Sequence, residues 1–162
     1  DKNYFSSQMH GILIEGDNKK WYESGGVQDV TISNNVFDNI GFEGGAVYPL
    51  LASPLLTDEQ RMGERHFHRN IRFIDNTIRS FNGLVAQARS VSGLSISGNK
   101  LELSSDYPSN DEFPSIDLHY CDDVHIVDNT AAGFDHKLII APSSDSTDVE
   151  IKNNLGFQAH SE

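Results

Sequence analysis

The chain has 162 residues, with 12 Lys or Arg against 24 Asp or Glu, so its formal net charge is −12 at pH 7. This acidity argues against nucleic acid and anionic membrane as partners, because both are bound through basic surfaces. Cys121 is the single cysteine, so no disulfide forms within the chain, and no apolar stretch has the length of a spanning helix. We expect one domain over residues 1–162.

Six asparagines punctuate the chain, and most of them close one recurring phrase: turn residue, β-branched, polar, apolar, polar, polar, Asn. The asparagines are Asn3, Asn35, Asn76, Asn99, Asn129 and Asn154, and full copies of the phrase cover 29–35, 70–76, 93–99, 123–129 and 148–154. The alternation predicts half-buried strands. Spacings of 41, 23, 30 and 25 residues are too irregular for propeller blades and fit a solenoid with loops of varying length. The sequence therefore predicts an all-β fold, a parallel β-helix of about five to six coils.

The recurrent asparagine has a physical explanation. Asn tolerates the left-handed backbone of a sharp bend, and stacked amides can hydrogen-bond from coil to coil. The alternative, that each Asn only marks a polar turn, explains the copies one at a time. We predict a ladder of asparagine side chains along the solenoid.

A second strand is expected after each asparagine, at 11–15, 45–48, 83–87, 115–119 and 137–141. Period 2 then divides these residues between two faces. The inward set is Ile12, Ile14, Leu84, Ala86, Ile116, Leu118, Leu138 and Ile140, and the outward set is Leu13, Glu15, Val85, Gln87, Asp117, His119, Ile139 and Ala141. Because some outward residues are apolar, we expect this face to be covered or to form a groove.

The first insertion, residues 17–26, has the composition of a sugar site. Trp21 and Tyr22 are adjacent aromatics beside Asp17 and Glu23. An aromatic surface bordered by carboxylates can stack on a sugar ring and hydrogen-bond its hydroxyls. The alternative is that Trp21 folds back as a lid over apolar residues. A later insertion contains a possible short helical turn over residues 57–63.

Glu15 and Asp17 are the candidate catalytic pair. If both lie on one strand, their side chains face outward about 6.6 Å apart, within the separation of about 5 to 9.5 Å that glycosidases use. Side-by-side residues flank a scissile bond less readily, and both could be ordinary solvated acids.

Asp117, His119 and Arg89 form a second outward group on neighbouring rungs. They could bind a substrate hydroxyl or carboxylate and tune a proton donor, or form only surface ion pairs. Three coils separate Asp117 from Glu15, about 14 Å, which is too far for a direct acid/base pair.

No metal site or cofactor is predicted. Asp122 and Asp123 look like a dyad, but Asp123 aligns with the turn residue that opens each phrase, which favours a structural role. His66 and His68 stand among arginines, without the acids or thiolates of a zinc site.

The two ends of the chain match the middle of a coil, because residues 1–5 begin at the ladder asparagine and residues 153–157 stop after it. Solenoids need capped ends. We therefore expect a β-helix truncated at both ends, a piece of a longer protein with preceding coils or a homo-oligomer contact at the open end.

The stretch GILIEGDNKKWYESGGVQDVTISNN, residues 11–35, resembles glycoside hydrolase family 110, the α-1,3-galactosidases, and residues 68–72 and 88–94 look like that family too. The resemblance implies a right-handed parallel β-helix and an inverting, exo-acting α-galactosidase without a metal, secreted or periplasmic. It also implies that the catalytic aspartates lie on coils before the GILIEGD strand. Asp17, Trp21 and Glu23 would then shape the pocket, and this C-terminal portion would be inactive alone.

Two other classes stay open. A polysaccharide lyase would use Arg89 beside Asp117, although net charge −12 disfavours an acidic substrate. A non-enzymatic adhesin or sugar-binding β-helix would need no catalytic pair.

Overall fold

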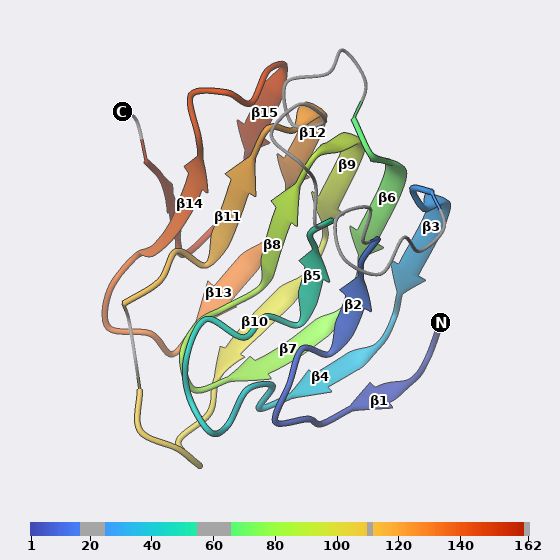
Figure 1. The fold of residues 1–162 in the computed structure, drawn as a ribbon. Helices are drawn as coiled ribbons and strands as arrows, with labels where there is room; N and C mark the ends of the chain where they lie inside the picture. The colour runs from blue at the N-terminus through green and yellow to red at the C-terminus, as the bar shows by residue number, and fades with distance from the viewer. Residues whose placement is uncertain (17–24, 55–65, 110–111, 161–162) are drawn as a thin grey trace.

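Three parallel β-sheets, wound by one chain, make up the fold (Figure 1). The computed structural model describes residues 1–16, 25–54, 66–109 and 112–160, which contain strands and no helix. Sheet A holds β1 (Tyr4–Phe5), β4 (Val36–Asp38), β7 (Thr77–Ser80), β10 (Lys100–Leu103) and β13 (Thr130–Ala132). Sheet B holds β2 (Ile12–Ile14), β5 (Leu50–Ala52), β8 (Ala86–Arg89), β11 (Ile116–His119), β14 (Leu138–Pro142) and β16 (Phe157–Ala159). Sheet C holds β3 (Gln28–Ser33), β6 (His68–Ile74), β9 (Val91–Ser97), β12 (Asp122–Val127) and β15 (Val149–Lys152).

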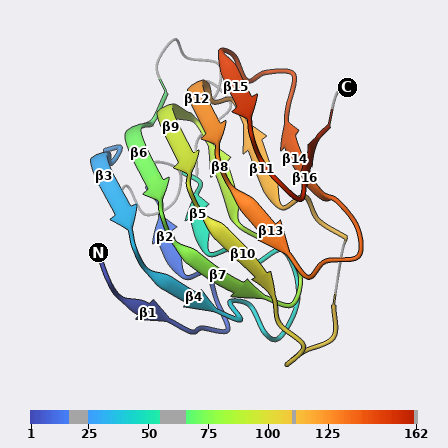
Figure 2. The ribbon, with the colours of Figure 1, turned by 180° about the vertical axis from the view of Figure 1, so that it is seen from behind.

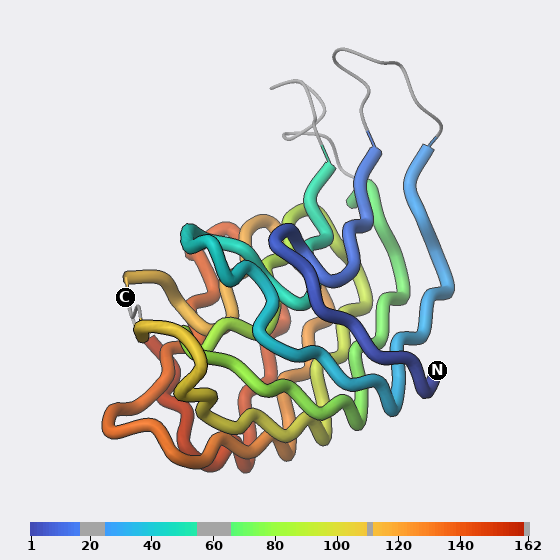
Figure 3. Tube along the Cα trace, turned by 90° about the horizontal axis from the view of Figure 1, so that it is seen from below, coloured from blue at the N-terminus to red at the C-terminus, as the bar shows by residue number. Residues whose placement is uncertain are grey.

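The chain passes through sheets A, B and C in turn, and each strand pairs in parallel with its counterpart one coil away (Figures 2 and 3). This arrangement is that of a β-helix solenoid and confirms the predicted all-β class. Sheet C consists of the predicted phrases. Sheet A was not predicted as a separate sheet, because its strands are two to four residues long and follow the asparagines directly.

The corner between sheets C and A has the same length in every coil. Two residues connect the strands: a left-handed residue and then the ladder asparagine, as in Asp75 and Asn76 between β6 and β7. The left-handed residues are Asn34 (φ 54), Asp75 (φ 54), Gly98 (φ 65), Asp128 (φ 58) and Asn153 (φ 55). The expected left-handed bend is therefore present, but the residue before the ladder asparagine makes it.

The ladder asparagines form a continuous hydrogen-bonded column. The backbone N–H and side-chain Nδ2 of Asn76 both donate to Oδ1 of Asn99, at 3.0 and 3.1 Å. The same Nδ2 also donates to the carbonyl of Ile32 at 3.0 Å, one coil back. Equivalent bonds join Asn3 to Asn35, Asn35 to Asn76, Asn99 to Asn129 and Asn129 to Asn154. The column thus satisfies backbone groups that the bend takes out of the sheets.

Inward side chains of all three sheets fill the core in stacks. Sheet C contributes Ile71, Phe73, Leu94, Ile96, Val124 and Ile126, all fully buried. The stacks continue through sheet A, where Phe5 and Phe37 lie with ring centroids 4.9 Å apart. Burying such side chains stabilises a fold by about 1.5–3 kcal/mol each before the cost of ordering the chain.

Two of the predicted second strands are displaced. The strand expected at 45–48 lies at β5, because Gly41, Gly44 and Gly45 all have positive φ and form a turn. The strand expected at 83–87 begins at Ala86, because the preceding residues form a turn in which Ser80 Oγ accepts from the Gly83 N–H. Strands β11 and β14 lie where they were predicted.

The possible helical turn over residues 57–63 lies outside the described residues. Within the described part of the chain, no helix has the length and apolar character needed to cross a bilayer.

Candidate functional site

The outward side of sheet B carries the polar groups that the sequence singled out. Register places Gln87 beside Asp117 and Arg89 beside His119 on the paired strands β8 and β11. Two parallel columns of residues therefore run across the strands of the sheet. The first column is Leu13, Leu51, Gln87, Asp117 and Ala141. The second column, two residues further along each strand, is Glu15, Ser53, Arg89, His119 and Ser143.

Asp117 is the centre of a hydrogen-bonded array on this face. Its Oδ1 lies 3.1 Å from His119 Nε2, and its Oδ2 accepts from Gln87 Nε2 at 2.7 Å. The side chain of Asp117 is only 15% exposed and that of His119 is 38% exposed. In the neutral imidazole, Nε2–H donates to Asp117, which leaves Nδ1 as an acceptor toward a ligand. The array thus presents a fixed carboxylate, an oriented imidazole and an amide.

A buried phenol lies close to the array. Tyr48 is 1% exposed, and its hydroxyl donates to the carbonyl of Pro114 at 3.1 Å. Burial and the negative charge of Asp117 raise the pKa of Tyr48 far above its ordinary value of 10.0. The phenol therefore stays neutral, and the bond to Pro114 fixes the segment that leads into β11.

The turn after β14 borders the array near His119. The N–H of Tyr120 donates to Asp145 Oδ1 at 2.8 Å, and Ser143 donates to the same carboxylate. Partial burial works to raise the pKa of Asp145, but the hydrogen bonds from Ser143 and Tyr120 outweigh it, so the pKa is lowered. Asp145 is therefore a stable carboxylate at neutral pH.

The sequence relatives of the chain share one activity in their names. Alpha-1,3-galactosidase B of Bacteroides thetaiotaomicron is 34% identical over 164 residues, which is 98% of this chain and 26% of the relative. Alpha-1,3-galactosidase A of Bacteroides fragilis is 37% identical over 112 residues, 67% of this chain and 18% of the relative. Alpha-1,3-galactosidase A of Shewanella woodyi is 29% identical over 141 residues, 86% of this chain and 22% of the relative.

The chain is related to the α-1,3-galactosidases, glycoside hydrolase family 110. The resemblance noted over residues 11–35 is thereby confirmed. The chain spans about a quarter or less of the length of these galactosidases. No family model matches it.

Four of the predicted site residues lie in the described part of this galactosidase relative: Glu15, Arg89, Asp117 and His119. It brings Asp117 and His119 together and places Arg89 beside His119, exposed. Within the described residues Arg89 makes no ion pair, so it does not join the array. Glu15 is exposed and follows β2, which ends at Ile14, so the strand expected over 11–15 stops one residue short of Glu15. Asp17, Trp21, Tyr22 and Glu23 lie outside the described residues, and the Glu15–Asp17 pair remains a prediction.

Other residues of the face had no role in the sequence-based prediction. Gln87 was placed outward, but its bond to Asp117 depends on the register between coils. Tyr48 was assigned to a strand, and Asp145 lies in a short turn of small polar residues. The sequence held one indication of these residues: Gln87 was predicted to point outward, two residues before Arg89 on the same strand.

Asp123, His66 and His68, which the sequence offered as a dyad or metal site, make other contacts. Asp123 lies within β12 rather than in a turn before it, and its φ of 53 is the left-handed backbone expected of a bend residue. His66 stacks on Tyr120 with ring centroids 4.6 Å apart, whereas His68 is fully buried and its Nδ1 accepts from the Val27 N–H at 3.1 Å. Among the described residues, no three His, Cys, Asp or Glu side chains gather as metal ligands.

Proposed function

We propose that the chain is the C-terminal β-helix segment of an exo-acting α-galactosidase and that the outward face of sheet B binds a terminal galactoside. The relation to enzymes named alpha-1,3-galactosidase carries this proposal. The segment would form part of a longer, right-handed β-helix in a secreted or periplasmic enzyme.

The array around Asp117 supports the assignment of the sugar site to this face. Sugar hydroxyls both donate and accept hydrogen bonds, and Asp117, His119 and Gln87 offer both kinds of group within one cluster. Because Asp117 is mostly buried, hydrogen bonds to it are less screened than bonds to a solvated acid. A hydroxyl that reaches this carboxylate is thus bound and oriented.

Binding of galactose to the 162-residue chain tests the proposal. In a 1H–15N NMR titration, we expect galactose to shift the side-chain NH2 of Gln87. Asp117→Asn should weaken binding about tenfold or more, because it removes a charge-assisted acceptor. The control is Asp128→Asn, an exposed left-handed position where other coils carry Asn. Equal affinities of the two variants, or no shift at Gln87, would contradict the proposal.

The same titration with galacturonate separates the rival classes. Tighter binding of the uronate than of galactose, lost in Arg89→Gln, would favour a lyase-like site. Hydrolysis is a separate question, because the family resemblance implies catalytic aspartates on other coils. We expect no turnover of p-nitrophenyl α-galactoside by this chain, and measurable turnover would refute that part of the proposal.

A further inference from the structure

His125 lies on the outward face of sheet C between two carboxylates. Its Nδ1 is 2.9 Å from Glu150 Oε2, and its Nε2 is 3.3 Å from Asp123 Oδ1. Asp123 and His125 belong to β12, whereas Glu150 belongs to β15 and lies directly beside His125 in the register of the two strands. The imidazole therefore bridges two neighbouring coils. Because the two acids contact opposite nitrogens of the ring, the three side chains do not converge on one point, as metal ligands would.

The two contacts require a proton on each ring nitrogen of His125. A neutral imidazole has one N–H and one lone pair, and a carboxylate oxygen repels a lone pair that is directed at it. An imidazolium donates from both nitrogens, so only the charged form satisfies both contacts. The hydrogen bond to Glu150 is the largest cause that raises the pKa of His125 above its ordinary value of 6.5, and Asp123 adds to this effect.

The strands around the histidine supply one further acid and one base. The register of β12 and β15 continues to Asp148, which lies beside Asp123. Lys152 donates to the other carboxylate oxygen of Glu150. On the opposite side, β9 places the uncharged Ser95 beside the histidine. The charged groups that face the imidazole from the described strands are thus three carboxylates and one ammonium.

Loss of the imidazolium proton changes the balance of charge across β12 and β15. Three negative charges face two positive charges while His125 is charged, and they face one when it is neutral. Like charges on neighbouring strands destabilise the pairing. The side chain of His125 is 49% exposed, so solvent screens each contact and the effect is modest. It falls on a sensitive place, because β15 pairs only with β12 among the described strands.

We propose that His125 is a proton-operated clamp, which holds β15 against β12 while the imidazole is charged and loosens β15 when the imidazole is neutral. The asparagine ladder joins the same two coils at every pH, because amides do not titrate. The clamp adds a contact that depends on pH. This inference does not depend on the galactoside site.

The pH range of the clamp follows from the direction of the pKa shift. Folding raises the pKa of His125, so the contribution of the clamp to stability is complete below pH 6.5. The contribution is lost as the pH rises through the pKa of the folded state. Strand β15 should therefore be held more firmly in mildly acidic solution than in alkaline solution.

Amide hydrogen exchange of the 162-residue chain tests the clamp. Protection factors are normalised to the intrinsic exchange rate at each pH and measured from pH 6.5 to about pH 9. We expect the protection of β15 relative to β9 to fall about threefold over this range, as suits exposed ion pairs. His125→Gln should give the lower protection at every pH, because glutamine cannot become charged.

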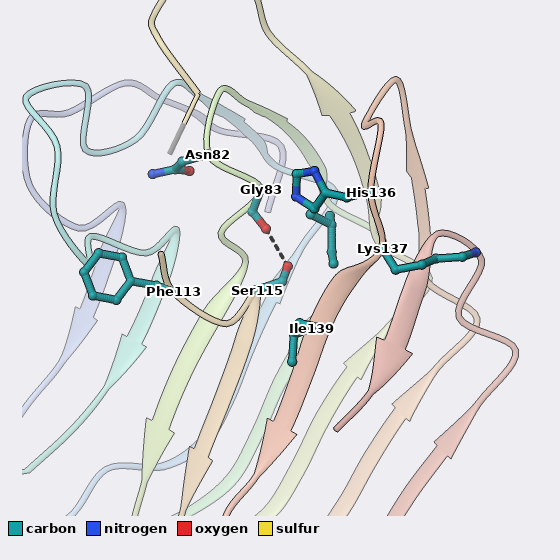
Figure 4. Close-up of a pocket in the computed structure, with 8 residues that line it drawn as sticks. Asn82, Gly83, Phe113, Ser115, His136, Lys137 and Ile139 are labelled. Carbon is teal, nitrogen blue, oxygen red and sulfur yellow. Dashed lines mark hydrogen bonds between the residues drawn. The ribbon is translucent and has the colours of Figure 1, made fainter. Parts of the chain in front are cut away.

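His136→Gln is the matched control. His136 also contacts a carboxylate, with Nδ1 2.7 Å from Asp135 Oδ1, and its side chain is 39% exposed. Its ring lines a small pocket at the corner between sheets A and B (Figure 4). Because its partner is the preceding residue, this pair joins no two strands. The control variant should keep the pH dependence of the unmodified chain.

An NMR titration of the His125 ring protons completes the test. Glu150→Gln should lower the pKa of His125, and the protection of β15 should then fall at a correspondingly lower pH. A pH-dependent fall that persists in His125→Gln would overturn the clamp. Titration of His125 without any change in the protection of β15 would overturn it too, as would an unchanged pKa of His125 in Glu150→Gln.

Discussion

The fold buries a titratable side chain, His68, in a way that changes its pKa. It lies in the core with no exposed surface, and its Nε2 has no hydrogen-bond partner among the described residues. Burial lowers the pKa of His68 from 6.5 to about 4, because a charged imidazole loses its hydration there. The unfolded chain therefore binds a proton at a pH where the folded chain does not.

The stability of the protein should fall as the pH drops from 6.5 to 4. The His68 contribution is full above pH 6.5 and is lost as the pH approaches the folded pKa of about 4, a loss on the order of 3 kcal/mol. Urea unfolding at several pH values measures it. His68→Gln, which cannot titrate, should flatten this part of the profile, whereas the exposed His160→Gln should leave its slope unchanged. Equal slopes for both variants would contradict the prediction.

Adjacent glycines give a second residue-scale prediction. A Cβ on Gly26 would lie 1.5 Å from the carbonyl oxygen of Phe67, whereas a Cβ on Gly25 would meet nothing within 4 Å. Gly26→Ala should therefore destabilise the fold by about 3 kcal/mol or more through backbone displacement. Gly25→Ala should change the free energy of unfolding by less than about 0.5 kcal/mol. Thermal melts of the two variants measure the contrast, and similar melting temperatures would rule the clash out.

At the scale of the element, the asparagine ladder binds one coil to the next. Asn99 accepts from both the backbone N–H and Nδ2 of Asn76, and its own Nδ2 donates to Phe73 and Asn129. The side chain thus serves buried groups on both neighbouring coils. A ladder asparagine in the middle of the column therefore contributes more to the free energy of unfolding than one at the end of the column.

Asn99→Ala should lower the free energy of unfolding by about 3 kcal/mol, because it leaves the buried N–H of Asn76 without its acceptor and removes the side-chain bonds to Phe73 and Asn129. Asn3→Ala is the matched control at the end of the column. No backbone N–H of the described residues bonds to the Asn3 side chain, so its loss should cost under about 1 kcal/mol. Chemical denaturation measures both changes, and a larger effect at Asn3 would contradict the ladder argument.

The sequence predicted some elements better than others for reasons of length. Sheet C strands alternate over six or seven residues in β3, β6, β9 and β12, so period 2 was visible there. Sheet A strands are too short for a recognisable pattern, although β4, β7 and β10 bury Phe37, Ile78 and Leu101. Asp117 and His119 were paired because they share one strand, whereas the role of Gln87 depends on register between coils, which residue spacing does not encode.

At the scale of the whole molecule, the single thiol reports on how the core opens. Cys121 has no exposed surface, and burial raises its pKa to about 11. Thiols react as thiolates and need access to reagent. The native protein therefore protects Cys121 twice, by exclusion of reagent and by suppression of the thiolate.

Labelling with a maleimide at pH 7 should be slow in buffer and complete within minutes in denaturing urea. Because the core is continuous across the coils, the rate in buffer should track global opening, and the destabilised Asn99→Ala variant should label faster. The control places a thiol at exposed Ser144, as Ser144→Cys in a Cys121→Ala background, which should label at once. Rapid labelling of native Cys121 would show that the core opens locally there.

The fixed length of the corner between sheets C and A has a consequence for how such proteins diversify. A residue added between Asp75 and Asn76 would shift the asparagine out of its column and disturb neighbouring coils together. The other two corners carry no such constraint, and both adjoin sheet B, whose strands start at one corner and end at the other. Insertions and deletions at these two corners therefore leave the asparagine column and the strand register unchanged. They can accumulate in evolution, or be introduced by loop grafting, around sheet B. The face that can change most freely is the one that carries Asp117 and His119.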